Sequence, residues 1–174
     1  MKAIVLAGGL ATRLRPLSRI VPKPLLPVLN EPILLRVLRG LREAGFVEIG
    51  VTIAPHCALI ERHLGSGGEL GIELTWLRES EPAGTGASLK LHRDFFGGSP
   101  ALVLTADMLT GVDLRGMADA YERSPATVTV AVAEQDPATW PGDVVVSDGD
   151  EGHAYLFRPG AAVSLRRTST RSKG

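Results

Sequence analysis

The sequence of 174 residues has few of the features that mark secreted, membrane-spanning or nucleic-acid-binding proteins. Cys57 is its one cysteine, so no disulfide can form within the chain, and this fits a reducing compartment such as the cytoplasm. Lysine and arginine together number 19, as do aspartate and glutamate, so no net charge draws the chain to nucleic acid or to a membrane surface. No apolar run approaches the length of a transmembrane helix. The apolar stretch after Lys2 is too short for a signal peptide.

Apolar periodicity predicts strands that alternate with helices along most of the chain. Strands are expected over residues 3–7, 47–53, 72–77, 101–105 and 127–133. Helices are expected over residues 33–44, 58–64, 87–95 and 114–121. This order predicts an α/β fold, with a mostly parallel sheet and helices on both faces. In such folds ligands bind at the carboxyl ends of the strands.

The composition, 44% hydrophobic and 22% charged, is ordinary for a globular protein, and the length fits one domain. We expect this domain over residues 1–160, with a β-hairpin over 143–147 and 153–157 near its end. Residues 161–174 carry basic and polar side chains without an apolar period. We therefore expect them to form a disordered basic tail.

The most informative segment follows the first expected strand. Gly8 and Gly9 come directly after it, and glycine lets backbone N–H groups approach an anion closely. Arg13 and Lys23 add two positive charges within reach of the same loop. The loop lacks the Gly-Lys-Ser/Thr of a P-loop and the third glycine of the dinucleotide fingerprint. The combination predicts a polyphosphate site of another kind, the alternative being a tight turn with surface charges.

From Gly8 to Pro24 the segment is GGLATRLRPLSRIVPKP, which resembles the signature GGxGTRLxPLT…PKP of sugar-1-phosphate nucleotidyltransferases. Ala11 stands at the third glycine of that signature. A methyl group there is tolerated if the backbone keeps a negative φ, and the alternative is that it crowds a phosphate. The resemblance runs from residue 1 to about residue 159, and it implies the Rossmann-like nucleotidyltransferase fold, similar to that of the glycosyltransferase-A proteins.

A second loop, ESEPAGTGA over residues 79–87, resembles the family's E-x-x-P-L-G-T-A-G segment, which lies over the nucleobase in relatives. Ala83 replaces the leucine of that segment. Glu79 is able to accept hydrogen bonds from a guanine edge, and Gly84 allows a flat base to lie against the backbone. The alternative is a proline turn in which Thr85 caps the following helix.

Asp107 follows the fourth expected strand in the sequence LVLTADML, which resembles the strand-end G-D-x-L whose aspartate holds magnesium in the family. A carboxylate suits a hard cation that bridges phosphates and keeps waters. The alternative role for Asp107 is to cap a helix, but Asp113 is closer to the next helix and is the expected cap. The resemblance therefore implies Mg²⁺ as the cofactor.

The resemblance implies a reaction in which a nucleoside triphosphate and a sugar 1-phosphate give an NDP-sugar and pyrophosphate. Arg13 and Lys23 are the implied catalytic residues. The residues implied in nucleotide binding are Leu6, Ala7, Gly8, Gly9, Thr12, Arg13, Lys23, Glu79 and Gly84. Gly142 and Arg158 are the implied contacts of the sugar phosphate, with Arg158 keeping the charge of a lysine found there in relatives.

Full-length relatives continue well past the point at which this sequence ends, with the rest of the sugar pocket and a second aspartate for the metal. The fold is therefore expected to be incomplete at the C-terminus. Two hypotheses follow: an active transferase, or a truncated, non-catalytic nucleotide-binding or regulatory homologue. Pairing with another chain, either a second copy or a partner, is one way in which the pocket could be completed.

The remaining charged side chains are expected to have structural or solvated roles. Arg36, Arg39 and Arg42 fall on the polar face of the first expected helix, which predicts that they are solvated. The histidines lack partners at metal-ligand spacing and are expected on the surface or in packing. They are His56, His63, His92 and His153.

Overall fold

The computed structural model describes residues 1–82, 84–124, 126–131, 144–147, 154–158 and 161–163. Contacts divide the chain into two units, Met1–Thr129 and Val130–Gly174, and each is described by itself. None of the helices in these described ranges is long and apolar enough to cross a lipid bilayer.

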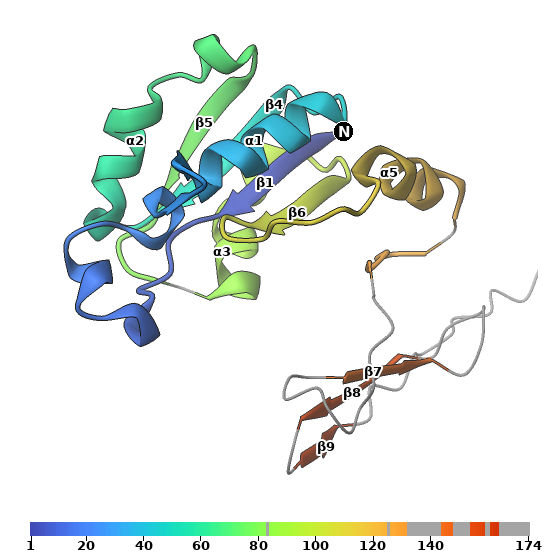
Figure 1. The fold of residues 1–174 in the computed structure, drawn as a ribbon. Helices are drawn as coiled ribbons and strands as arrows, with labels where there is room; N and C mark the ends of the chain where they lie inside the picture. The colour runs from blue at the N-terminus through green and yellow to red at the C-terminus, as the bar shows by residue number, and fades with distance from the viewer. Residues whose placement is uncertain (83, 125, 132–143, 148–153, 159–160, 164–174) are drawn as a thin grey trace, which may run out of the picture. The chain divides into compact units, whose positions relative to one another are not determined.

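The first unit is built on a parallel sheet of four strands in the order β5-β4-β1-β6 (Figure 1). The strands are β1 (Lys2–Leu6), β4 (Glu48–Ile53), β5 (Glu73–Arg78) and β6 (Ala101–Thr105). The central strand β1 pairs on both sides, with Ala3 opposite Ile49 of β4 and Leu102 of β6. This confirms the predicted parallel sheet, and it brings the carboxyl ends of all four strands to one edge.

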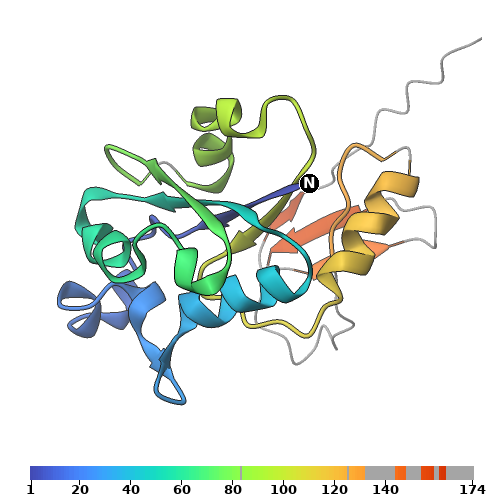
Figure 2. The same cartoon turned by 90° about the horizontal axis from the view of Figure 1, so that it is seen from above.

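Helices cover both faces of the sheet, as the sequence predicts; Figure 2 shows α1 and the pair α3 and α4 on opposite sides. The helices are α1 (Ile33–Glu43), α2 (Ala58–Leu64), α3 (Thr85–Leu91), α4 (Arg93–Phe96) and α5 (Leu114–Arg123). On one face, Leu38 and Leu41 of α1 are fully buried in the same core cluster as Val5. On the other, a Cβ on Gly50 would lie 2.9 Å from the Phe95 ring of α4, so glycine lets this helix approach β4 closely.

Two expectations for the elements up to residue 131 differ from the structure. The helix expected over 87–95 begins earlier, at Thr85, and is divided at His92 into α3 and α4. The strand expected over 127–133 is wrong for residues 127–131, which form no strand and leave Val128 and Val130 about 70% exposed. High β-propensity reflects packing against a neighbouring strand, and none of the described strands pairs with residues 127–131. Residues 132 and 133 lie outside the described residues.

The second unit contains an antiparallel sheet of three strands. Its strands β7 (Val144–Ser147) and β8 (Ala154–Arg158) form the predicted hairpin, with Val144 opposite Phe157. The third strand, β9 (Ala161–Val163), pairs with β8 and falls within the expected disordered tail. That expectation is wrong for residues 161–163, because pairing with β8 satisfies the backbone of this short apolar segment. The rest of the tail lies outside the described residues.

Short elements join β1 to α1: the 3₁₀ turns η1 (Thr12–Leu14), η2 (Leu17–Arg19) and η3 (Lys23–Leu25), and the hairpin of β2 (Pro27–Val28) and β3 (Glu31–Pro32). Two further 3₁₀ turns, η4 (Pro55–Cys57) and η5 (Gly68–Leu70), flank α2.

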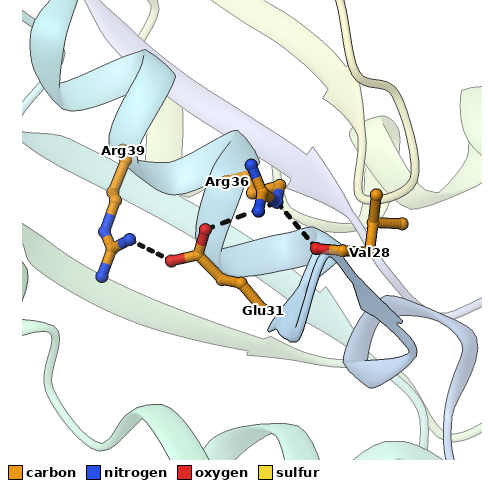
Figure 3. A network of polar contacts seen from close by, with 4 residues as sticks. All are labelled: Val28, Glu31, Arg36 and Arg39. Carbon is orange, nitrogen blue, oxygen red and sulfur yellow. Dashed lines mark hydrogen bonds and ion pairs between the residues drawn. The ribbon is translucent and has the colours of Figure 1, made fainter.

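The hairpin is fastened to α1 by a polar network (Figure 3). Glu31 forms ion pairs with Arg36 and Arg39, and Arg36 Nε donates a hydrogen bond of 3.1 Å to the carbonyl of Val28. Arg39 and Arg42 are exposed, as predicted, whereas Arg36 is half-buried. The ion pairs of Arg36 and Arg39 were not predicted. Their partner Glu31 lies in a two-strand hairpin that the periodicity of the sequence does not reveal. The network fixes the chain just after η3.

Candidate functional site

A pocket of about 310 Å³ lies at the carboxyl edge of the sheet in the first unit. It gathers residues from the ends of the four parallel strands, where ligands bind in open α/β folds. Most of the predicted nucleotide and metal residues line it: Leu6, Ala7, Gly8, Gly9, Lys23, Glu79, Gly84 and Asp107. The structure thus brings together three segments that lie far apart in the sequence.

The glycine turn is held by β4 at the floor of the pocket. The backbone N–H of Ala7 donates to both the carbonyl oxygen and the hydroxyl of Thr52, at 3.2 and 3.1 Å. The thiol of Cys57 donates to the carbonyl of Ala7, and burial raises the pKa of this thiol. Cys57 therefore stays protonated at neutral pH and supports the turn rather than acting as a nucleophile.

Neither Gly8 nor Gly9 has a positive φ, so the backbone conformation does not require glycine at these positions. Their contribution is the space left by the missing side chains. A Cβ on Gly8 would lie 3.2 Å from Oε2 of Glu79. A Cβ on Gly9 would meet nothing within 4 Å, so it would extend into the open pocket. The space at the Cβ position of Gly9 is therefore open to a ligand.

Lys23 and Asp107 form an ion pair at the pocket wall, bridging η3 and the end of β6. Each side chain is about one-third exposed. Burial by itself raises the pKa of Asp107, but hydrogen bonds from Lys23 and Thr105 and the charge of Lys23 outweigh it, so the pKa lies below its ordinary value. Asp107 is accordingly a carboxylate at neutral pH.

Glu79 follows β5 and is 5% exposed, with its carboxylate Oε1 accepting a hydrogen bond from the hydroxyl of Ser88. The alternative role for this loop, capping of α3 by Thr85, is not what the structure shows. The N-cap is Gly84, with a φ of 80° and no side-chain hydrogen bond. By contrast, Asp113 does cap α5, accepting from the N–H of Gly116 at 2.9 Å, as predicted.

Two predicted residues of the first unit do not line the pocket. Thr12 and Arg13 lie on η1, exposed to solvent and outside the residues that line the pocket. Arg158 lies on β8 in the second unit. Gly142 lies outside the described residues. The roles of these four residues stay predictions.

Comparison with known proteins gives a consistent result. A family model described as nucleotidyl transferase matches residues 2–157. The chain belongs to the nucleotidyl transferase family. Among curated relatives, a mannose-1-phosphate guanylyltransferase catalytic subunit beta from Danio rerio is 34% identical over 94% of this chain and 47% of its own length. A mannose-1-phosphate guanylyltransferase from Mycobacterium tuberculosis is 34% identical over 88% of this chain and 43% of its own.

The fold comparison agrees with this family. A candidate glucose-1-phosphate thymidylyltransferase from Bacillus anthracis superposes with a TM-score of 0.68 at 28% identity, covering 72% of this chain and 51% of that one. A UDP-glucose pyrophosphorylase from Acinetobacter baumanii gives a TM-score of 0.61 at 23% identity, covering 72% and 53%. The Rossmann-like nucleotidyltransferase fold is thus confirmed. The chain spans about half the length of the curated relatives it matches.

Sequence reasoning did not assign four polar residues that line the pocket, Thr52, Thr85, Ser88 and Thr105. Thr52 is a polar residue in an otherwise apolar strand, and it is 1% exposed. That pattern signals a buried hydrogen bond. Ser88 directly follows the second glycine loop, but its contact with Glu79 is evident only once the loop is folded.

Ala11 adopts the left-handed backbone conformation, with φ 46° and ψ 44°, so the condition of a negative φ is not met. Its carbonyl accepts hydrogen bonds from the N–H of Leu14 and the hydroxyl of Ser18, which hold the turn in place. The glycine found here in the family signature avoids this backbone strain.

We therefore expect Ala11→Gly to raise the free energy of unfolding by about 0.5–1 kcal/mol, because the relieved strain exceeds the added entropy of the unfolded chain. Chemical denaturation measures this change. Ala58→Gly is the matched control, since Ala58 is exposed, begins α2 with φ −57°, and should lose stability on the same substitution. A loss of stability in both variants would contradict the strain at Ala11.

Proposed function

We propose that the protein is a Mg²⁺-dependent nucleotidyltransferase that joins GTP to a sugar 1-phosphate of the mannose class and releases pyrophosphate. The observation that carries the proposal is one pocket that holds the glycine turn, Lys23, Glu79 and Asp107 together. The names of the Danio rerio and Mycobacterium tuberculosis relatives support guanine and mannose 1-phosphate. Another relative, from Streptomyces griseus, is named a glucose-1-phosphate thymidylyltransferase and matches 62% of this chain. Guanine is favoured because Glu79 supplies acceptor oxygens to the donor edge of that base.

In the proposed reaction an oxygen of the sugar phosphate attacks the α-phosphorus of GTP in line. The bond from that phosphorus to the bridging oxygen breaks, and pyrophosphate leaves with the electron pair. No protein nucleophile is required, because phosphoryl chemistry depends mainly on positioning and charge. The backbone amides of Gly8 and Gly9, with Arg13, would hold the β- and γ-phosphates. Lys23 would stabilise the charge that develops at the α-phosphoryl group.

The residues present fit a magnesium ion. Asp107 offers ionised carboxylate oxygens at the pocket wall, and Mg²⁺ is commonly bound by one or two carboxylates together with substrate phosphates. When bound, the ion would neutralise phosphate charge and orient the leaving group. Lys23, now paired with Asp107, would then be free to turn toward a phosphate.

The second candidate function is nucleotide binding without turnover. Within the described part of the chain, no three histidine, cysteine, aspartate or glutamate side chains lie close enough to hold a metal ion together.

Gly142 and Arg158 remain the proposed sugar-phosphate residues. A second copy of the chain or a partner chain is proposed to complete the pocket. A cytoplasmic location, suggested by the lone cysteine, is also part of the proposal.

Both candidates predict that GTP with Mg²⁺ stabilises the fold. At a concentration 100 times the dissociation constant, the added stability is about 2.7 kcal/mol, which raises the melting temperature by several degrees. Thermal scans with GTP, ATP, UTP and dTTP measure the shift and its base preference. No shift with any nucleotide at millimolar concentration would contradict the nucleotide site. Release of pyrophosphate from GTP and mannose 1-phosphate then separates the two candidates, since only the transferase produces it.

A further inference from the structure

Two buried polar side chains, Glu79 and Ser88, and the largely buried His92 lie together where the second glycine loop meets α3. Glu79 has a side chain that is 3% exposed, and that of His92 is 11% exposed. Ser88, 4% exposed, donates its hydroxyl hydrogen bond to Oε1 of Glu79. Ser88 and His92 are one helical turn apart, so both face Glu79 from the same side of α3.

His92 is left with an unsatisfied nitrogen. Its Nε2 is buried and has no hydrogen-bond partner, the one such side-chain nitrogen or oxygen within the described ranges. Oε1 of Glu79 lies 3.8 Å from this nitrogen, which is slightly beyond hydrogen-bond distance. A buried polar atom without a partner is costly, so a small rotation that brings Nε2 and Oε1 together is favourable.

The two oxygens of Glu79 have different surroundings. Oε1 faces Ser88 and His92, whereas Oε2 faces Gly8, where a Cβ would approach it to 3.2 Å. Gly8 lines the pocket, so Oε2 is the oxygen on the ligand side. Two donors on Oε1 would fix the plane of the carboxylate and leave Oε2 to accept hydrogen bonds from a ligand.

We propose that His92 is a positioning residue for guanine recognition: in the nucleotide-bound protein its Nε2–H donates to Oε1 of Glu79 and directs Oε2 to the donor edge of the base. This inference rests on the proposed function, because it requires Glu79 to read the base. An adenine edge presents an acceptor nitrogen where guanine presents N–H groups, so a fixed carboxylate favours GTP over ATP. A carboxylate that is free to rotate discriminates less.

The test is to measure the dissociation constants of GTP and ATP, each with Mg²⁺, by calorimetry on the whole chain. His92→Leu removes the donor while keeping an apolar body, and it should reduce the preference for GTP about tenfold or more. His92→Gln keeps a donor near the position of Nε2, and it should restore the preference to within about threefold of the unsubstituted protein. The control is His63→Leu, because His63 lies exposed on α2 and should leave the preference unchanged. His92→Asn, whose amide is too short to reach Glu79, is measured in addition so that the test does not depend on the folding of the leucine variant.

The outcomes separate this inference from the proposed function. If the unsubstituted protein has no preference for GTP, the guanine assignment is wrong and the inference falls with it. If the preference exists and is the same in His92→Leu and His92→Asn, only the role of His92 is wrong. A purely structural histidine would lower the melting temperature and weaken both nucleotides equally, which would also overturn the proposal. Loss of the preference with rescue by glutamine supports it.

Discussion

Replacing Gly9 by valine should abolish nucleotide binding and leave the stability of the unliganded fold nearly unchanged. An added Cβ at Gly9 meets no atom within 4 Å, and the residue has no positive φ, so the fold itself accepts a side chain there. The same open space belongs to the pocket, and a branched side chain would keep phosphates away from the backbone. Lost charge-assisted hydrogen bonds of about 1.5–3 kcal/mol each, together with the steric clash, should weaken GTP binding about 100-fold or more.

Calorimetry with GTP and Mg²⁺ measures the loss, and thermal unfolding without ligand measures the stability. Gly111→Val is the matched control. Gly111 also has open space at its Cβ and no positive φ, but it does not line the pocket. Unchanged GTP affinity in Gly9→Val would show that phosphates do not approach this turn. A large drop in melting temperature would show that Gly9 is needed for the fold instead.

The sequence predicts the parts of the fold that are encoded locally. Ala3, Ile4 and Val5 form a buried strand because the apolar run leaves no polar side chain to solvate, and Gly8 and Gly9 end it. In a parallel sheet such turns must meet at one edge, so the common location of Gly9, Glu79 and Asp107 follows from topology. Most of the pocket could therefore be predicted.

The features that could not be predicted depend on partners distant in the sequence. Lys23 and Asp107 are 84 positions apart, and nothing in either motif indicates that the two side chains pair. Thr52 binds the backbone of Ala7 across 45 positions. The error over residues 127–131 has the same origin, because β-propensity cannot show whether a neighbouring strand exists. The local sequence pattern predicts a helix or a strand. The tertiary contacts that this helix or strand makes depend on the whole fold.

The ion pair of Lys23 with Asp107 leads to a prediction in which two variants change GTP binding in opposite directions. Asp107→Asn should remove the effect of Mg²⁺ on GTP affinity, because an amide is a poor ligand for a hard cation. The same variant should bind GTP more tightly than the unsubstituted protein when Mg²⁺ is absent, since Lys23 is then released to contact a phosphate. Lys23→Ala should weaken GTP binding about tenfold or more with or without Mg²⁺.

Calorimetry measures the GTP affinity of both variants, each with Mg²⁺ and with EDTA. Glu48→Gln is the control. Glu48 also pairs with a lysine, Lys2, at 3.3 Å, but neither residue lines the pocket. Both side chains of the Lys23–Asp107 pair are about one-third exposed, so the pair contributes at most about 1 kcal/mol, and both variants should remain folded. If Asp107→Asn keeps the full response to Mg²⁺, the metal is held elsewhere. If Asp107→Asn is unfolded in the absence of ligand, the carboxylate of Asp107 is needed for the fold. Asp107 is then a structural partner of Lys23 and not a metal ligand.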